Sequence, residues 1–233
     1  MGLLRIKSMP AAVLLSFTAI VTFVYALNFM FFADCYVTGG AGDCFTLLSN
    51  DTTETSNSYG NGGPETAFNG VLMFGIFIST AIILNEGAKG KWTTMIPVIA
   101  GLTTMSAMLW IHWGDSLDSS ETPKYVVPVV LVAYIAAYWF LMSEDEVNDG
   151  LSEFAPGVNV KDTPALLALG LLIIMGIYYC FRAILDPQSV VDLVEGGDPS
   201  EGLGAPSTVT VAVGGSLFLV YLLWTMLTVL DGP

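Results

Sequence analysis

The sequence predicts an all-α integral membrane protein, a bundle of six transmembrane helices that forms a single transmembrane domain over residues 1–233. Two observations predict this fold. Of the 233 residues, 54% are hydrophobic and only 12% are charged, whereas soluble domains carry about 25% charged residues. The apolar residues also occur in long blocks, six of them near the length of about 20 residues that crosses the hydrocarbon core as a helix. A membrane β-barrel would instead show alternating segments of about ten residues.

Each predicted span is an apolar stretch without Asp, Glu or Lys, because a charge in hydrocarbon is costly. In chain order the spans are 10–33, 67–84, 93–113, 125–142, 165–184 and 207–230. The first span follows Arg5 and Lys7, as a secretory signal would, but its apolar run exceeds the about 7–15 residues of a signal core. We therefore expect it to be an uncleaved helix.

The prolines mark where the spans begin. Pro10, Pro64, Pro123, Pro164 and Pro206 stand just before or at the start of five spans. A proline there costs nothing, since the first N–H groups of a helix have no partner within the helix.

The basic residues predict the orientation. Six crossings bring both termini to one side, and five of the seven basic residues then share that side, Lys124 and Arg182 being the exceptions. The five are Arg5, Lys7, Lys89, Lys91 and Lys161. By the positive-inside rule, we predict that both termini face the cytoplasm.

The predicted outer loops are acidic. They hold thirteen acidic residues against two basic ones, a formal charge of −11 out of −14 for the chain. Such a face argues against binding nucleic acid or anionic lipid. Two interpretations stay open, a solvated face in a saline medium and a cation-attracting mouth. In the second, Asp118, Glu121 and Arg182 are candidate ion contacts. For Arg182 the default expectation is that its side chain reaches the interface, and the alternatives are pairing with Asp186 or binding an anionic group.

Two outer segments are predicted to be loops, and the first of them is expected to be irregular. The first, residues 34–66, is the largest loop and is rich in Gly, Asn, Thr and Ser. Cys35 and Cys44 in it are expected to form a disulfide if the face is not cytoplasmic, the alternative being two free thiols. Asn50 begins a glycosylation sequon, which is used only in a eukaryotic source. The second segment, residues 186–206, is the last outer loop and is rich in Gly and Asp. Its run 196–202 is interpreted as a structural turn, because it lacks the alternating oxygen ligands of a calcium loop.

His112, the one histidine of the chain, lies at the outer end of the third span between Trp110 and Trp113. Asp115 follows three residues later and would share a helical face with it, so it could orient an imidazole that binds a metal or a tetrapyrrole. The simpler alternative is an interfacial histidine among belt tryptophans. A single histidine excludes bis-histidine haem within one chain, and the usual catalytic zinc takes three protein ligands.

The interiors of the spans carry hydroxyls and small residues instead of charges. Hydroxyls in such helices mostly bond back to their own helix, and small residues let helix backbones approach closely. No span holds a Lys for a retinal Schiff base, and the sequence identifies no cofactor. Cys180 is expected to be a small packing residue.

Three functions stay open. The sequence favours a non-catalytic subunit or scaffold of a larger membrane assembly, with the lipid bilayer and other membrane subunits as partners. The alternatives are a passive channel or facilitator for a small solute or cation, and a pigment- or cofactor-binding protein that uses His112. Which membrane holds the protein is not encoded in these features.

Overall fold

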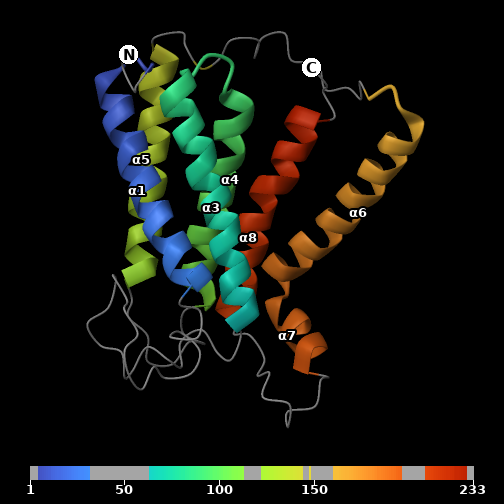
Figure 1. Ribbon diagram of the computed structural model, residues 1–233. Coiled ribbons are helices and arrows are strands. Elements are labelled where there is room, and N and C mark those ends of the chain that lie inside the picture. Colours follow the sequence, from blue (N-terminus) through green and yellow to red (C-terminus); the bar gives the residue numbers. More distant parts are fainter. Residues whose placement is uncertain are drawn as a thin grey trace.

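The computed structural model describes residues 5–31, 63–112, 122–143, 147, 160–195 and 208–229. These residues form seven helices and one π-helical turn, with no strand among them (Figure 1). The helices are α1 (Met9–Phe31), α3 (Gly63–Glu86), α4 (Trp92–His112), α5 (Thr122–Ser143), α6 (Thr163–Leu185), α7 (Pro187–Glu195) and α8 (Thr208–Trp224), which continues into the turn η5 (Thr225–Val229). All except α7 are long and apolar enough to cross a membrane. Within the described residues, the prediction of an all-helical protein with six helices suited to cross a membrane is confirmed.

The observed helix ends lie within a few residues of the predicted ones when η5 is counted with the sixth span, and the largest shift is then at the start of α3. This helix begins at Gly63, four residues before the predicted start of the second span. Pro64 and Glu65 extend it toward the N-terminus, because proline needs no N–H partner in a first turn and a carboxylate there favours the helix dipole. Apolarity alone did not reveal this first turn.

The segment that follows α6 corrects the sequence-based prediction. Residues 186–206 were predicted to be an outer loop, but Pro187–Glu195 form the helix α7. The run 196–202, predicted to be a structural turn, lies outside the described residues. Pro187 and Val191, one turn apart, are buried, whereas Gln188 and Asp192 on the next row are exposed. This short amphipathic pattern packs α7 against α6 and α8. The prediction failed because the Gly- and Asp-rich residues further along dominated the composition of the segment.

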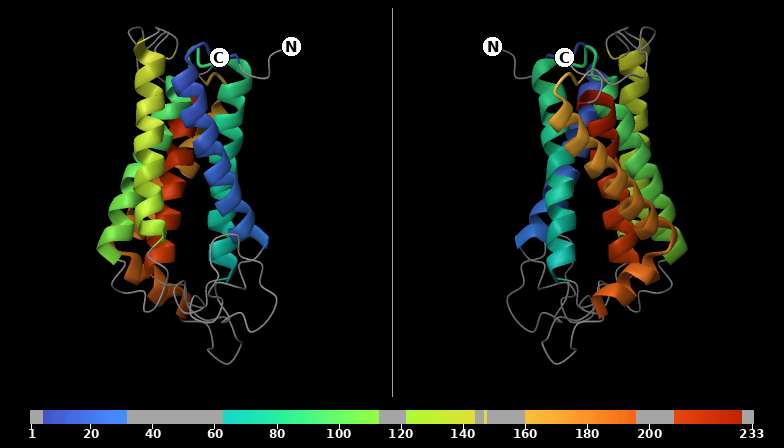
Figure 2. Two further views of the ribbon diagram at one scale, coloured as in Figure 1. Left: turned by 90° about the vertical axis from the view of Figure 1, so that its left-hand side faces the viewer. Right: turned by 90° about the vertical axis from the view of Figure 1, so that its right-hand side faces the viewer.

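Five of the spans form a closed ring. Substantial contacts run from α1 to α3, from α3 to α8, from α8 to α4, from α4 to α5, and from α5 back to α1. Figures 1 and 2 show these helices side by side, with α8 inserted between α3 and α4 although it comes last in the chain. The sixth span, α6, lies outside the ring, and its substantial contacts are with α8 and α7.

The two ends of the ring differ in charge. The start of α1 meets the end of α3, where the amide of Arg5 donates a hydrogen bond to the carbonyl oxygen of Leu84 at 3.1 Å. We call this the basic end, because α1 begins there, η5 ends there, and the connection between α3 and α4 carries Lys89 and Lys91 (Figure 1). Lys124 and Arg182 lie at the opposite end.

Polar bonds between helices in the ring are few and specific. The Asn69 side-chain amide donates to the carbonyl oxygen of Thr210 at 3.1 Å and joins α3 to α8. The Tyr221 hydroxyl donates to the carbonyl oxygen of Leu72 at 2.6 Å. The indole N–H of Trp224 donates to the carbonyl oxygen of Thr94 at 2.9 Å. Many of the span hydroxyls bond within their own helices, as predicted, although the buried hydroxyl of Ser106 has no hydrogen-bond partner. The hydroxyls that donate to a carbonyl oxygen of their own helix are those of Thr18, Thr22, Ser79, Thr80, Thr103, Thr104, Ser216 and Thr225.

Candidate functional site

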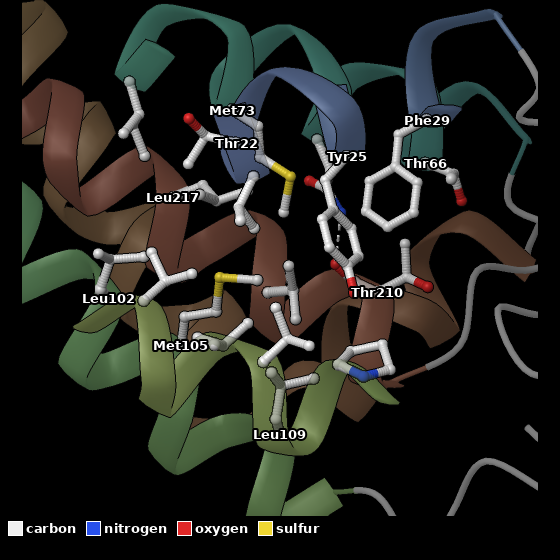
Figure 3. A pocket seen from close by; sticks show the side chains of 18 residues that line it. Thr22, Tyr25, Phe29, Thr66, Met73, Leu102, Met105, Leu109, Thr210 and Leu217 are labelled. Carbon is white, nitrogen blue, oxygen red and sulfur yellow. Dashed lines mark hydrogen bonds between the residues drawn. The ribbon is translucent and has the colours of Figure 1, made fainter. Parts of the chain in front are cut away.

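The five-helix ring encloses a cavity of about 50 Å³ (Figure 3). Every helix of the ring contributes to its wall, and α6 does not. The lining includes Thr66 near the start of α3, Leu109 near the end of α4 and Thr210 near the start of α8. The cavity therefore lies in the half of the ring that is farther from the basic end. We call it the ring cavity.

Most of the wall is apolar and adaptable. Met73 of α3 and Met105 of α4 approach the cavity from opposite sides, while Tyr25 extends from α1 toward α8 (Figure 3). Methionine is flexible and polarizable, so it adapts to ligands of irregular shape. The volume is enough for a few water molecules or a small apolar group.

One polar group of the wall is unsatisfied. Thr66 is only 1% exposed, and its hydroxyl oxygen is buried without a hydrogen-bond partner. Leaving a buried hydroxyl unpaired costs about 1–3 kcal/mol. A water molecule or a ligand with one polar group would recover this energy. The neighbouring Asn69 already uses its amide on Thr210.

The half of the ring toward the basic end is packed. Leu15, Met95, Val98, Tyr134 and Leu141 fill it, and all five are buried with essentially no exposure. They come from three helices of the ring, α1, α4 and α5. The ring cavity is thus blocked on that side in this conformation, which suits a binding site better than a continuous pore.

The predicted site around His112 is described only in part. His112 is the last residue of α4, one turn beyond Leu109 of the cavity wall, and its side chain is half-buried. Trp113, Asp115, Asp118 and Glu121 lie outside the described residues. The pairing of His112 with Asp115 and the ion contacts of the two other acids therefore stay predictions. Within the described residues, no group of three or more His, Cys, Asp or Glu is arranged to hold a metal ion.

Arg182 joins α6 to α7. Its Nε donates to the hydroxyl of Ser189 at 2.9 Å, and Nη2 donates to the Ser189 carbonyl oxygen at 3.3 Å. Nη1 donates to the hydroxyl of Tyr178 at 3.2 Å. The guanidinium thus stabilises the turn between two helices, and its contact with an external ion stays a prediction.

Of the three cysteines, only Cys180 lies in the part of the chain that the structure describes. Cys180 is buried in α6, and its Sγ donates to the carbonyl oxygen of Gly215 in α8 at 3.3 Å, which agrees with the predicted packing role. Cys35 and Cys44 lie outside the described residues, as do Asn50 and most of the loop 34–66. Their disulfide and the use of the sequon stay predictions.

Two polar residues of the ring cavity, Thr66 and Asn69, were not identified from the sequence. Thr66 fell just outside the predicted second span, which was taken to begin at residue 67. Asn69 lay inside that span, and an amide in an apolar run was the available signal, since polar groups inside membrane helices point to function or to contacts between helices. The partner of Asn69 is 141 residues away in the chain.

The six apolar helices define a multi-pass integral membrane protein. Comparisons of the chain with protein families, with curated proteins and with solved structures find no match.

Proposed function

We propose that this protein is a non-catalytic subunit of a membrane assembly and that α6 is the helix that binds its partner. The observation that carries this proposal is the position of α6 relative to the closed ring. The ring forms without α6, and the chain nevertheless holds a sixth apolar span outside it.

The contact between α6 and α8 covers only one half of α6. Gly176 faces Phe218 and Leu222, and Gly215 of α8 faces Cys180 and Ala183. These contacts lie in the half of α6 that is farther from the basic end. Toward the basic end α6 diverges from α8, as Figure 1 shows.

The diverging half of α6 consists of residues 163–172, about 15 Å of helix at 1.5 Å per residue. Nothing lies within 4 Å of the position where a Cβ of Gly170 would stand. Leu167 and Leu171 are 70% and 60% exposed. We call this segment the α6 arm.

A second protein helix is the occupant that best fits the space beside the α6 arm. In lipid, helices associate mainly through van der Waals packing, and the arm forfeits this packing with its own chain. A helix from another subunit, or from a second copy of the chain, would restore the contact on the arm. It would pack against the exposed row that Leu167 and Leu171 form, one turn apart, on the side of α6 away from α8.

Photo-crosslinking in native membranes tests the proposal. A photoreactive amino acid is placed at Leu167 or Leu171, and at Val132 of α5 as a control that is equally exposed but lies on the ring. We expect both arm positions to join the same protein, of defined mass, and Val132 to give lipid adducts only. Lipid adducts at all three positions would contradict the assembly role.

A second measurement ties the crosslink to assembly. In nanodiscs prepared directly from the membrane, the double change Leu167→Ala and Leu171→Ala is expected to lower the particle mass to that of one chain. Val132→Ala is the matched control and should leave the mass unchanged. An unchanged mass in the double variant would show that the arm does not hold the partner.

The alternative functions receive less support from the cavity. A tetrapyrrole or pigment needs a site of about 300–1,000 Å³, whereas the ring cavity measures about 50 Å³ and its wall does not include His112. A facilitator needs a passage, and the packed half around Tyr134 and Leu141 closes the ring.

A further inference from the structure

A groove runs along the outside of the ring between α1 and α5. It measures about 380 Å³, and its wall includes Phe17, Ile20, Val129 and, at the end nearest the start of α5, Thr122 and Tyr125. The surface that it presents is entirely apolar. This volume lies within the range of sites that hold drug-sized ligands. We call it the α1–α5 groove.

The groove and the ring cavity share part of one wall. Val21 and Tyr25 of α1 and Val126 of α5 line both spaces. A single layer of three side chains therefore separates the interior of the ring from the outside of the bundle. Tyr25 is the largest of the three, and rotation of its ring is the smallest change that would connect the two spaces.

We propose that the α1–α5 groove binds one acyl chain of a bilayer lipid, and that the layer of Val21, Tyr25 and Val126 is a lateral gate through which the end of this chain enters the ring cavity. The proposal concerns α1 and α5, so it does not depend on the partner that we assign to α6.

The position of the groove argues for a lipid chain as its occupant. The groove belongs to two membrane-spanning helices, so hydrocarbon is the solvent that reaches it. From Thr122 to Val129 it follows α5 for about 10 Å at 1.5 Å per residue. It begins near the end of the span, where a headgroup would lie, and runs toward the middle of the bilayer, as an acyl chain does.

The groove also has an anchor of the interfacial kind at its end. Trp110 and Tyr125 meet edge to face with ring centroids 5.9 Å apart, and Tyr125 lines the groove. The ammonium of Lys124 lies 4.8 Å from the centroid of Trp110. Aromatic and basic side chains of this type mark the headgroup level of a bilayer. They therefore place the groove in the leaflet that is farther from the basic end.

The ring cavity is suited to the end of the chain rather than to a whole molecule. Its apolar wall and small volume match a few methylene groups, and Met73 and Met105 can adjust to them. Burial of each methylene is favourable relative to water, although a chain that leaves lipid gains chiefly the closer packing. The free energy that offsets opening of the gate is therefore the closer packing of these methylene groups against the cavity wall.

Photolabelling of the full-length protein in phosphatidylcholine proteoliposomes tests the proposal. Part of the lipid carries a diazirine at the end of one acyl chain, and the adducts are mapped by mass spectrometry of peptides. We expect adducts on Met73 or Met105 inside the ring in addition to those on groove residues. Adducts confined to outward-facing residues would overturn the gate.

Two matched variants separate the groove from general contact with lipid. Val129 is 56% exposed and lines the groove, whereas Val132 on the same helix is 65% exposed and lies outside it. Val129→Trp fills the groove and should reduce labelling inside the ring at least fivefold, and Val132→Trp should leave it unchanged. Equal labelling in both variants would overturn the route.

A third variant tests the gate itself. Tyr25→Ala removes the largest side chain of the layer and is expected to raise labelling of Met73 and Met105 severalfold without changing labelling at Val129. An unchanged yield inside the ring would show that Tyr25 does not restrict entry. The Val129 and Val132 pair still tests the route if Tyr25→Ala fails to fold.

Discussion

Gly70 sets how closely α1 and α3 approach. A Cβ at this position would lie 2.7 Å from the amide nitrogen of Met30 and 2.9 Å from the carbonyl oxygen of Ala26. Both are backbone atoms of α1, so they cannot rotate away and the helices would have to separate. Close backbone approach at a small residue is how membrane helices gain packing energy.

Substitution of this glycine should therefore destabilise the protein, whereas the same change at Gly170 should not. We expect Gly70→Ala to lower the free energy of unfolding by about 1–3 kcal/mol, the usual cost of overpacking. Gly170 has open space around it, and alanine there should be neutral or stabilise the helix by up to about 1 kcal/mol. Unfolding by SDS in mixed micelles measures both. Equal effects of the two changes would contradict this account of the contact between α1 and α3.

At the scale of the element, α7 depends on a few hydrogen bonds at its first turn. The hydroxyl of Ser189 accepts from Nε of Arg182 and donates to the carbonyl oxygen of Asp186 at 2.8 Å. Gln188, one residue earlier, bonds only to the exposed Asp192 on the same helix. These neighbours form a matched pair of positions.

Ser189→Ala is expected to loosen α7 from α6. Loss of these bonds should cost about 1–2 kcal/mol, which corresponds to about a 5–30-fold larger open population. Hydrogen exchange of the peptide that covers residues 187–195 should be faster by that factor. Gln188→Ala should change exchange little, because exposed pairs contribute little. Similar exchange in both variants would mean that Arg182 does not hold α7.

The spans could be predicted from the sequence, because the bilayer requires a fixed length of apolar residues whatever the partners of a helix. Their neighbours could not. The residues of α6 and α8 are similarly apolar, yet α8 packs between α3 and α4 within the ring and α6 lies outside it. An apolar surface on all sides gives no buried face, so the sequence contains no periodic signal for the order of the helices.

The same reasoning explains why the ring cavity was missed at the scale of the whole molecule. Its wall combines residues from five helices, and most of them are ordinary apolar residues of a span. The few polar residues of the wall, such as Thr66 and Asn69, come together there only when α8 closes the ring. A cavity of this kind is a property of the assembled bundle rather than of a motif.

The distribution of basic residues over the whole molecule predicts its orientation. All five basic residues assigned to one side by the sequence lie on segments at the basic end, and Lys124 and Arg182 lie at the opposite end. Because basic residues close to span ends are retained in the cytoplasm, we expect the basic end to face inward. The lysines themselves can report this.

An impermeant amine-reactive ester applied to intact cells is expected to label Lys124 and to leave Lys89 and Lys161 unlabelled until the membrane is permeabilised. Lys89 and Lys161 are exposed, so their protection in intact cells would come from the membrane and not from burial. Lys124→Arg is the control, because it removes the outer label and keeps the charge. Peptide mass spectrometry reads each site separately. Labelling of Lys89 and Lys161 in intact cells would establish the reverse orientation, and the acidic loops would then face the cytoplasm.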